Sequence, residues 1–548
     1  MISHIRRTIT SRVPQVPRIW APGIDAPRSL PRAWRGIALL FCLALSACRT
    51  PPPPPGTVVL ILESSPNNLD LRQGTDVQSE RTGSLIFDSL VKKDADFNLQ
   101  PWLATSWEQP DPLTWIFRLR DGVRFHDGRP LEAADVVWTI QSLIDPALTK
   151  SLPGGTLISP KSGSFAAVDR VEARDRLTVV VRLKRPDPAL LFNLSDGLFG
   201  VVPRGSGADL GIHPIGSGPY RFVSQMQDKE VVLERAPGCW SEPNGLAPYA
   251  RLQFNIVPDT ITSALELQKG SADAASNVLT PDMVYALRNS PAVEIATTPG
   301  SSIWYLNFNV ADPLLRDRRV RQAVALAIDR PAIIASLDRG KARLAEGSLL
   351  PPGYWATADP ASLAQYPHSP ARAQALLEAA GYRAGADGVR IHLALKTSTD
   401  EQTRQLAAVL QQQLRAAGIA LSIRSAEFGT FYSDVTHGAF QMYILKWIGS
   451  NEDPDIFRYM YSSASFPPQG ANRGHYVNPA LDALLAQAAA ESGPDAQTRR
   501  RADYIEIQKI LSVDLPSIPL WFPSSSLVHS RRLHNATAQP DGNFDFLR

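Results

Sequence analysis

Cysteine is scarce in this chain: its 548 residues include only Cys42, Cys48 and Cys239. These spacings provide neither a zinc site nor a framework of disulfides. We interpret Cys239 as a small, partly buried apolar side chain rather than as a nucleophile. The nine histidines show no His-x-x-x-His or similar pairing, so we expect no metal site and no cofactor.

Long apolar runs are missing as well. The longest candidate, from Gly36 to Ala47, follows Arg35 and has twelve residues. As a helix it would span about 18 Å, whereas the hydrocarbon core of a bilayer is about 30 Å thick. A basic flank, a short apolar stretch and small residues at its end are typical of a secretory signal, which we place at residues 1–47. No second run follows Ala47, so we expect the rest of the chain to lie outside the bilayer.

A charge excess of one sign is absent from the main part of the chain. The net charge of +3 arises in residues 1–47, which hold seven arginines and a single acid, Asp25. The residues after position 47 carry 49 basic and 52 acidic side chains. A body with this balance has no global attraction for nucleic acid or anionic lipid.

The end of the signal suggests an anchor. Leu45-Ser46-Ala47-Cys48 resembles a bacterial lipobox, which implies that Cys48 is diacylated and becomes the new N-terminus. The alternative is that Cys48 is an ordinary residue of a signal cleaved nearby. Prolines 51–55 predict a stiff, extended tether over residues 48–56. Residues 1 to about 29 are long and proline-rich for a signal, and a translation start placed too far upstream explains them most simply.

From Thr57 onward the pattern predicts a mixed α/β fold. Residues 115–120 and 177–183 are rich in β-branched and aromatic side chains and predict strands. A capping serine, a proline and a closing glycine bound a predicted helix over 369–381. A second helix over 401–417 leads directly into an alternating strand over 419–423, as in a sheet covered by helices.

The motifs that could carry catalysis are weak. Residues 216–220 lack the spacing of a phosphate loop or a nucleophile elbow and predict a tight turn before a strand. His126 and Asp127 lie in a turn, where adjacent side chains rarely share a proton. Glu452 and Asp453 could serve a glycosidase or peptidase, but a turn leading into a helix at 456–461 explains the pattern equally well. We therefore expect a protein that is not an enzyme.

The most specific feature of the sequence is a series of short segments that follow one another in a fixed order. It includes Phe125-His126-Asp127-Gly128, the turn at residues 216–220, and the helix start Asn478-Pro479. The whole series comprises residues 68–70, 90–91, 101–107, 117–123, 125–131, 134–137, 216–220, 257–259, 267–273, 306–307, 320–323, 327–330, 478–485 and 518–520. In this order, over almost the whole chain from Thr57 to Phe522, it resembles bacterial extracellular solute-binding proteins of family five, the dipeptide- and oligopeptide-binding group.

The resemblance implies an α/β fold of the periplasmic binding protein-like type II class, with two main lobes, a hinge and an extra third lobe. Lobe I would comprise residues 57–88, 210–305 and 506–548, lobe II residues 89–209, and lobe III residues 306–505. Ligand would be enclosed between lobes I and III, with crossings near Asn307 and Tyr504 as the hinge. Closure is then a population shift driven by contacts that the ligand makes better in the closed form.

By the same resemblance, the chain is a monomeric binding component of an ABC importer. It would capture a peptide or another polar small solute and deliver it to a membrane permease from the periplasm or cell envelope. It would have no nucleic-acid partner. Two other interpretations remain open: a solute-binding sensor or chaperone-like lipoprotein, and the glycosidase or peptidase already mentioned.

The ligand-binding stretch of the family corresponds here to residues 447–454. Trp447 is present, but the position of the aspartate that pairs with a peptide's amino group holds Ser450. A charge-assisted hydrogen bond contributes about 1.5–3 kcal/mol, so this departure puts peptide binding in question unless Glu452 or Asp453 substitutes. The expected ligand-binding residues are Trp447, Gly449, Ser450, Asn451, Asp453, Glu63, Ser65, Asn67, Tyr305 and Asn307. For Trp447 the alternative is plain core packing.

Overall fold

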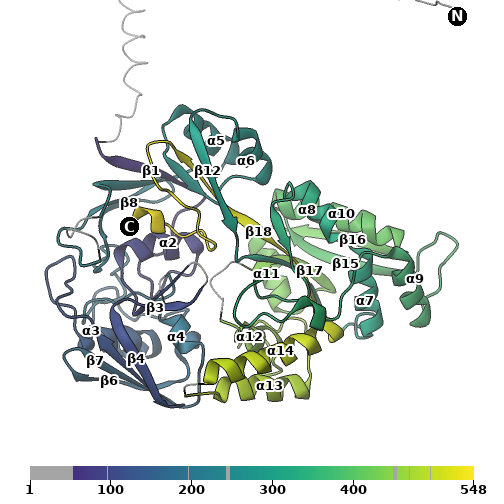
Figure 1. Cartoon of the computed structure of the whole chain (residues 1–548), viewed down its shortest axis with the longest axis horizontal. Helices are drawn as coiled ribbons and strands as arrows, with labels where there is room; N and C mark the ends of the chain where they lie inside the picture. Colours follow the sequence, from purple (N-terminus) through teal and green to yellow (C-terminus); the bar gives the residue numbers. More distant parts are fainter. Residues whose placement is uncertain are drawn as a thin grey trace, which may run out of the picture. The chain divides into compact units, whose positions relative to one another are not determined.

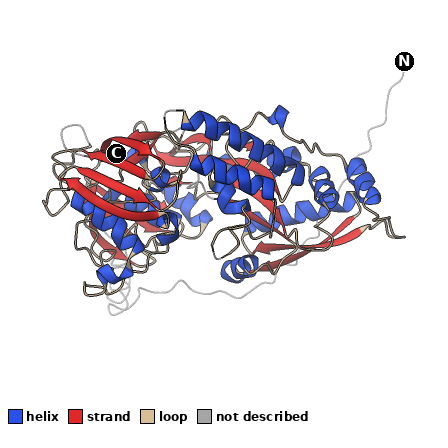
Figure 2. Ribbon diagram, turned by 90° about the horizontal axis from the view of Figure 1, so that it is seen from below, coloured by secondary structure: helices blue, strands red, loops and turns tan. Residues whose placement is uncertain are grey.

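The computed structural model describes residues 54–548, apart from 95–96, 196, 242–246, 448–452, 468 and 494. The predicted signal at 1–47, the lipidation site Cys48 and most of the tether at 48–56 lie outside the described residues. Gly56–Arg548 form a unit of their own (Figure 1). Helices pack against its strands, so the predicted α/β class is confirmed (Figure 2).

A twelve-stranded sheet organises the described part of the chain. Along the sheet the strands follow the order β16-β15-β17-β13-β18-β11-β1-β10-β9-β8, and β12 and β14 also pair with β18. Their bounds are β16 Ile419–Ala426, β15 Ile391–Ser398, β17 Met442–Trp447, β13 Ile303–Phe308, β18 Ser517–Ser530, β11 Ala274–Ser276, β1 Thr57–Leu62, β10 Arg251–Ile256, β9 Glu230–Arg235, β8 Tyr220–Met226, β12 Val293–Pro299 and β14 Ala342–Leu344.

The N-terminal part of this sheet is built around β1. This strand runs parallel to β10 and β11 on either side and is buried at every residue. A parallel strand covered on both faces has no polar face, which explains its continuous apolar sequence. The surrounding helices are α2 Val77–Ile86, α5 Thr260–Lys269 and α6 Pro281–Leu287, with the short η5 Asp545–Leu547 near the C-terminus.

The C-terminal part of the sheet has a helical layer on each face. Along β13, Trp304, Leu306 and Phe308 enter one core, whereas Ile303 and Tyr305 enter the other, as the alternation of a strand requires. The first core is covered by α7 Arg318–Ala327, α8 Arg330–Leu337, α9 Pro370–Ala379 and α10 Glu401–Ala416. The second is covered by α11 Phe428–Thr436, α12 Ile456–Tyr461, α13 Pro479–Ala490 and α14 Ala496–Asp514. The short helix η4, Pro360–Ser362, lies in the loop between β14 and α9. Helices α9 and α10 and strand β16 confirm the predicted segments.

A separate antiparallel sheet of four strands lies between residues 104 and 183. Its order is β4 Ala104–Asp111, β5 Thr114–Leu119, β7 Thr178–Leu183 and β6 Val168–Asp175. Helix α3, Ala133–Ile144, packs on it, and its core also receives the residues around β2 Val91–Lys93, β3 Leu99–Pro101 and α4 Leu190–Asn193. The short helices η1 Pro146–Thr149 and η2 Ser162–Phe165 complete this region. Both strands that the sequence predicts here are confirmed.

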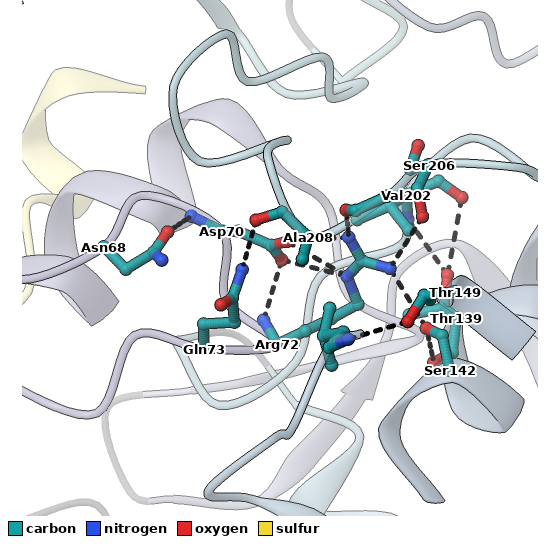
Figure 3. Close-up of polar contacts among 12 residues, drawn as sticks. Asn68, Asp70, Arg72, Gln73, Thr139, Ser142, Thr149, Val202, Ser206 and Ala208 are labelled. Atoms are coloured by element: carbon teal, nitrogen blue, oxygen red, sulfur yellow. Dashed lines mark hydrogen bonds and ion pairs between the residues drawn. The ribbon is translucent and has the colours of Figure 1, made fainter. Parts of the chain in front are cut away.

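A buried ion pair joins the loop after β1 to this second region. Asp70 and Arg72 are at most 1% exposed, and Arg72 Nη2 lies 2.7 Å from Asp70 Oδ2. The same guanidinium donates to Ser142 Oγ of α3 and to the carbonyls of Ser206 and Gly207 (Figure 3). The family-like Asn68-Leu69-Asp70 motif is therefore a structural joint, in which the buried charge is fully hydrogen-bonded.

The chain passes between the two parts of the long sheet at two adjacent places. Strand β18 pairs with β13 and β14 up to Pro523 and with β12 and β11 from Ser524 onward. The second passage is the link between β12 and β13, residues 300–302. A Cβ on Gly300 would lie only 2.3 Å from the Pro523 carbonyl oxygen, so the two passages touch. Asn307 lies inside β13 and Tyr504 inside α14, and a hinge near these two residues stays a prediction.

Candidate ligand-binding site

Trp447 ends β17, where it pairs with Ile303 of β13. Its side chain is half-buried and its ring meets that of Tyr459 at 6.1 Å and 72°. The indole Nε1 is buried and has no hydrogen-bond partner among the described residues. An indole usually finds an acceptor when it is buried, but Nε1 of Trp115, Trp138 and Trp304 is likewise buried without a partner among the described residues. Ligand contact by Trp447 therefore stays a prediction.

Tyr305 and Asn307 lie on the neighbouring strand, β13, and both are buried. The Tyr305 hydroxyl accepts a hydrogen bond from Arg473 Nη1 at 3.4 Å, and its ring meets that of Tyr443 at 6.0 Å. Burial raises the pKa of Tyr305 well above its usual value, and the neighbouring Tyr443 adds to this effect. Asn307 donates to the Phe308 carbonyl oxygen at 3.5 Å. In this conformation the Asn307 side chain is hydrogen-bonded to the backbone of its own strand, whereas Tyr305 lies in a cluster of tyrosines.

Asp453 is already engaged within the protein. Its carboxylate lies 3.1 Å from Arg500 Nη2 and accepts the backbone N–H of Asp455 at 2.8 Å, which shapes the turn before α12. Burial raises the pKa of Asp453, while the adjacent Arg500 opposes this rise. The predicted turn and helix are confirmed. A carboxylate held in this way is poorly placed to replace Ser450 as an amine acceptor.

Glu63, Ser65 and Asn67 follow the carboxyl end of β1, the edge at which open α/β sheets bind ligands. Ser65 Oγ accepts the backbone N–H of Asp228 at 2.8 Å, and Asn67 Oδ1 accepts the Ser79 hydroxyl at 2.9 Å. Both side chains therefore fix neighbouring loops. Glu63 is exposed and forms no hydrogen bond among the described residues. Asn67 is exposed as well, whereas Ser65 is half-buried.

Gly449, Ser450 and Asn451 lie outside the described residues, as does Glu452. Their role in ligand binding therefore stays a prediction.

The structure adds residues that the sequence did not single out. Arg473 is 5% exposed, and its Nη2 donates to the Tyr432 hydroxyl at 2.9 Å. Tyr432, Tyr459 and Phe428 are large aromatic side chains exposed by 39%, 45% and 53%. Arg473 precedes Gly474 in a loop in which the sequence shows no functional motif. Only its burial beside tyrosines identifies it as a candidate site residue.

A cavity of about 720 Å³ opens in the same C-terminal part. Volumes of this size are usual for small-molecule sites. It is lined mainly by the loop of residues 346–360 and the start of α14, including Tyr354, Trp355, Arg501 and Phe522. Among the described residues, none of those expected from the sequence lines it. Trp355 nevertheless packs on Tyr504, and Arg500 lies over the Trp355 ring, which connects the cavity to Asp453.

Two expectations about chemistry can be compared with the geometry. His126 Nε2 lies 2.9 Å from the Gly218 carbonyl oxygen, whereas Asp127 binds Arg129, so the two side chains turn to different partners as predicted. Among the described residues, no three His, Cys, Asp or Glu side chains come together in a way that could hold a metal ion. The described helices also include none that is both long and apolar enough to cross a membrane.

Comparisons with known proteins agree with this architecture. The family model of bacterial extracellular solute-binding proteins, family 5 Middle, matches residues 98–467. The probable di/tripeptide-binding protein 5 of Pseudomonas aeruginosa is 28% identical over 509 residues, which cover 89% of this chain and 94% of that protein. The glutathione-binding protein GsiB of Escherichia coli strain K12 is 27% identical over 500 residues, with coverages of 89% and 93%.

A solved structure extends the comparison to three dimensions. NikZ from Campylobacter jejuni, determined in complex with Ni(L-His), has a TM-score of 0.75 and 25% identity, covering 90% of this chain and 98% of that chain. The type II periplasmic binding protein fold expected from the sequence is thereby confirmed. Since the family model alone spans well over half of the residues, this chain belongs to the bacterial extracellular solute-binding proteins of family 5.

Proposed function

We propose that this protein is the binding component of an ATP-driven importer and that its solute is a short peptide or a similar polar molecule. The observation that carries this proposal is the extent of the similarity to the di/tripeptide-binding and glutathione-binding relatives, which covers 89% of the chain in each case. The relatives' names concern peptides of two or three residues. The protein would bind its solute and release it chemically unchanged.

The mechanical part of the proposal is closure of lobe I, residues 57–88, 210–305 and 506–548, on lobe III, residues 306–505. Lobe II, residues 89–209, would stay fixed to lobe I through the Asp70–Arg72 joint. The hinge would consist of residues 300–302 and the Pro523–Ser524 step of β18. Ligand contacts made only in the closed form would shift the population toward it.

The cellular setting follows from the leader. We infer that the chain is exported, that Cys48 carries the lipid, and that residues 48–56 hold the body away from the membrane of the cell envelope. The body would act as a monomer and deliver its solute to a permease. The site would combine Trp447, Tyr305 and Glu63 with the segment that contains Gly449, Ser450 and Asn451.

Small-angle X-ray scattering tests closure directly. With Ala-Ala, Ala-Ala-Ala or glutathione at saturating concentration, the radius of gyration should fall, and mass spectrometry should recover the peptide intact. Calorimetry on the same samples should give one site per chain. Hydrolysis of the peptide, or an unchanged scattering curve despite measurable binding, would contradict the proposal.

A further inference from the structure

Arg473 is a buried cation, and it has no carboxylate partner among the residues that the structure describes. Among the described residues its guanidinium forms no ion pair; it donates Nη1 to Tyr305 and Nη2 to Tyr432, and its Nε donates to nothing. Arginine stays charged at every accessible pH. Burying such a charge without an anion is unfavourable, so a bound anion would stabilise this arrangement.

Other buried arginines of the protein show how such a charge is normally compensated. Arg72 and Arg500 lie against the carboxylates of Asp70 and Asp453. Arg321 has no carboxylate at ion-pair distance among the described residues, but it donates to four backbone carbonyls. In the described part of the chain Arg473 donates only to phenolic oxygens, which are weaker acceptors than carboxylates. Its environment therefore differs from that of a purely structural arginine.

The tyrosines around Arg473 have hydrogen-bonding capacity to spare. In the described part of the chain, the hydroxyls of Tyr432 and Tyr459 donate to no acceptor, although each carries one O–H donor. The backbone of Tyr459 lies next to the loop that carries Arg473, because its carbonyl accepts the N–H of Ala471 at 2.8 Å. Burial raises the pKa of the Tyr459 hydroxyl, and the charge of Arg473 opposes this rise. An anion placed here would accept from the guanidinium and from these hydroxyls together.

The cluster is also open to solvent on one side. Phe428 and Tyr432 stack at 5.8 Å, and both are exposed, as is Tyr459. The Tyr459 ring in turn meets the ring of Trp447 at 6.1 Å. Exposed aromatic side chains grouped around a buried cation are an expected lining for a ligand site rather than for a bare protein surface.

We propose that Arg473, together with the hydroxyls of Tyr432 and Tyr459, forms an anion-accepting subsite that takes a carboxylate of the captured solute. This inference rests on the proposed solute-binding function and names the chemical class of the solute. The planar guanidinium can bind the two oxygens of a carboxylate at once. The solute would thus be recognised by its acidic end.

The test compares matched probes that differ only at that end: Ala-Ala-Ala and its C-terminal amide, titrated calorimetrically. We expect the wild type to bind the acid at least tenfold more tightly than the amide, since charge-assisted hydrogen bonds are about twice as strong as neutral ones. Arg473→Met should remove this preference. Tyr459→Phe, at an exposed position, should reduce it severalfold and keeps the test valid if Arg473→Met fails to fold.

Two control variants separate the subsite from general effects. Tyr285→Phe removes a hydroxyl at a similarly exposed tyrosine of α6, and Arg170→Met removes an exposed cation of β6 that pairs with Glu172. Both should leave the acid-to-amide ratio unchanged. A ratio near one in the wild type, or a ratio that survives both Arg473→Met and Tyr459→Phe, would overturn the subsite while leaving solute binding intact.

A complete lack of tripeptide binding would count against the proposed peptide function instead. The subsite is then judged with acetate as the probe, at constant ionic strength set with chloride. Quenching of tryptophan fluorescence by acetate that saturates in the wild type and is lost in Trp447→Phe and Tyr459→Phe would support it. Absence of a saturable response in the wild type would reject it.

Discussion

At the scale of single residues, substitution of Trp447 would show whether this side chain binds ligand or packs in the core. Its side chain is half-buried beside Tyr459, whereas Trp521 is 1% exposed in the neighbouring core. Trp447→Ala should weaken solute binding at least tenfold and lower the melting temperature by only a few degrees. Trp521→Ala, the matched control, should cost about 3–5 kcal/mol of unfolding free energy. A comparable loss of stability in both variants, measured by urea denaturation, would assign Trp447 to the core.

Asp70 gives a second prediction at this scale. Asp70→Asn leaves the Arg72 charge buried without its anion, so we expect a loss of about 3–5 kcal/mol in unfolding free energy. The surface pair of Arg170 and Glu172 provides the comparison, because both side chains are about half exposed. Glu172→Gln should change stability by less than about 1 kcal/mol. Equal effects of the two variants would show that the joint in Figure 3 is not stabilising.

At the scale of elements, the passage between β12 and β13 is constrained by Gly300. A methyl group there would meet the Pro523 carbonyl oxygen at 2.3 Å, whereas one on Gly163 would meet nothing within 4 Å. Gly300→Ala should destabilise the protein by about 1–3 kcal/mol through overpacking and alter closure in scattering. Gly163→Ala should be nearly neutral. A fully stable Gly300→Ala protein that closes normally would mean that the two passages separate easily.

Helix α2 carries a pH-dependent element. Burial raises the pKa of Glu80 from 4.5 to about 7, although Lys161 Nζ lies 3.9 Å away and Lys93 and Arg81 are also near. The folded protein therefore keeps this proton where the unfolded chain has lost it, so stability should fall as the pH rises from about 4.5 to 7.

The size of this effect is at most about 3 kcal/mol. Glu80→Gln should flatten the fall, which urea denaturation at pH 4.5, 6 and 7.5 would show. Glu172→Gln serves as the control and should retain the slope of the wild type. An unchanged slope in Glu80→Gln would assign the pH dependence to other groups.

At the scale of the whole molecule, the predicted anchor and the body can be separated. Cys48→Ser should move the protein from the membrane fraction to the periplasmic fraction of a bacterial host, because one residue would carry the lipid. Solute binding by the purified body should not change. Tight membrane association of the Cys48→Ser protein would refute lipidation at this position.

Local patterns predicted many of the elements correctly. The residues that bound α9, Ser369 as the cap and Pro370 in the first turn, act on the chain within a few positions. The alternation that follows α10 likewise gave β16, and the turn before β8 was read correctly from its glycines. Capping, turn geometry and side-chain alternation depend on neighbours in sequence, which is why these features could be predicted.

The sequence by itself determined the fold class, most of the elements tested and, through the order of its segments, the family. The tertiary structure alone decided the partners of individual side chains. It committed Asp453 to Arg500 and Asn67 to Ser79. It also brought Arg473 against Tyr305 and Tyr432, which lie 168 and 41 positions away in the sequence. Such contacts depend on how distant strands and loops pack, and burial, which makes a lone arginine informative, does not exist until that packing is complete.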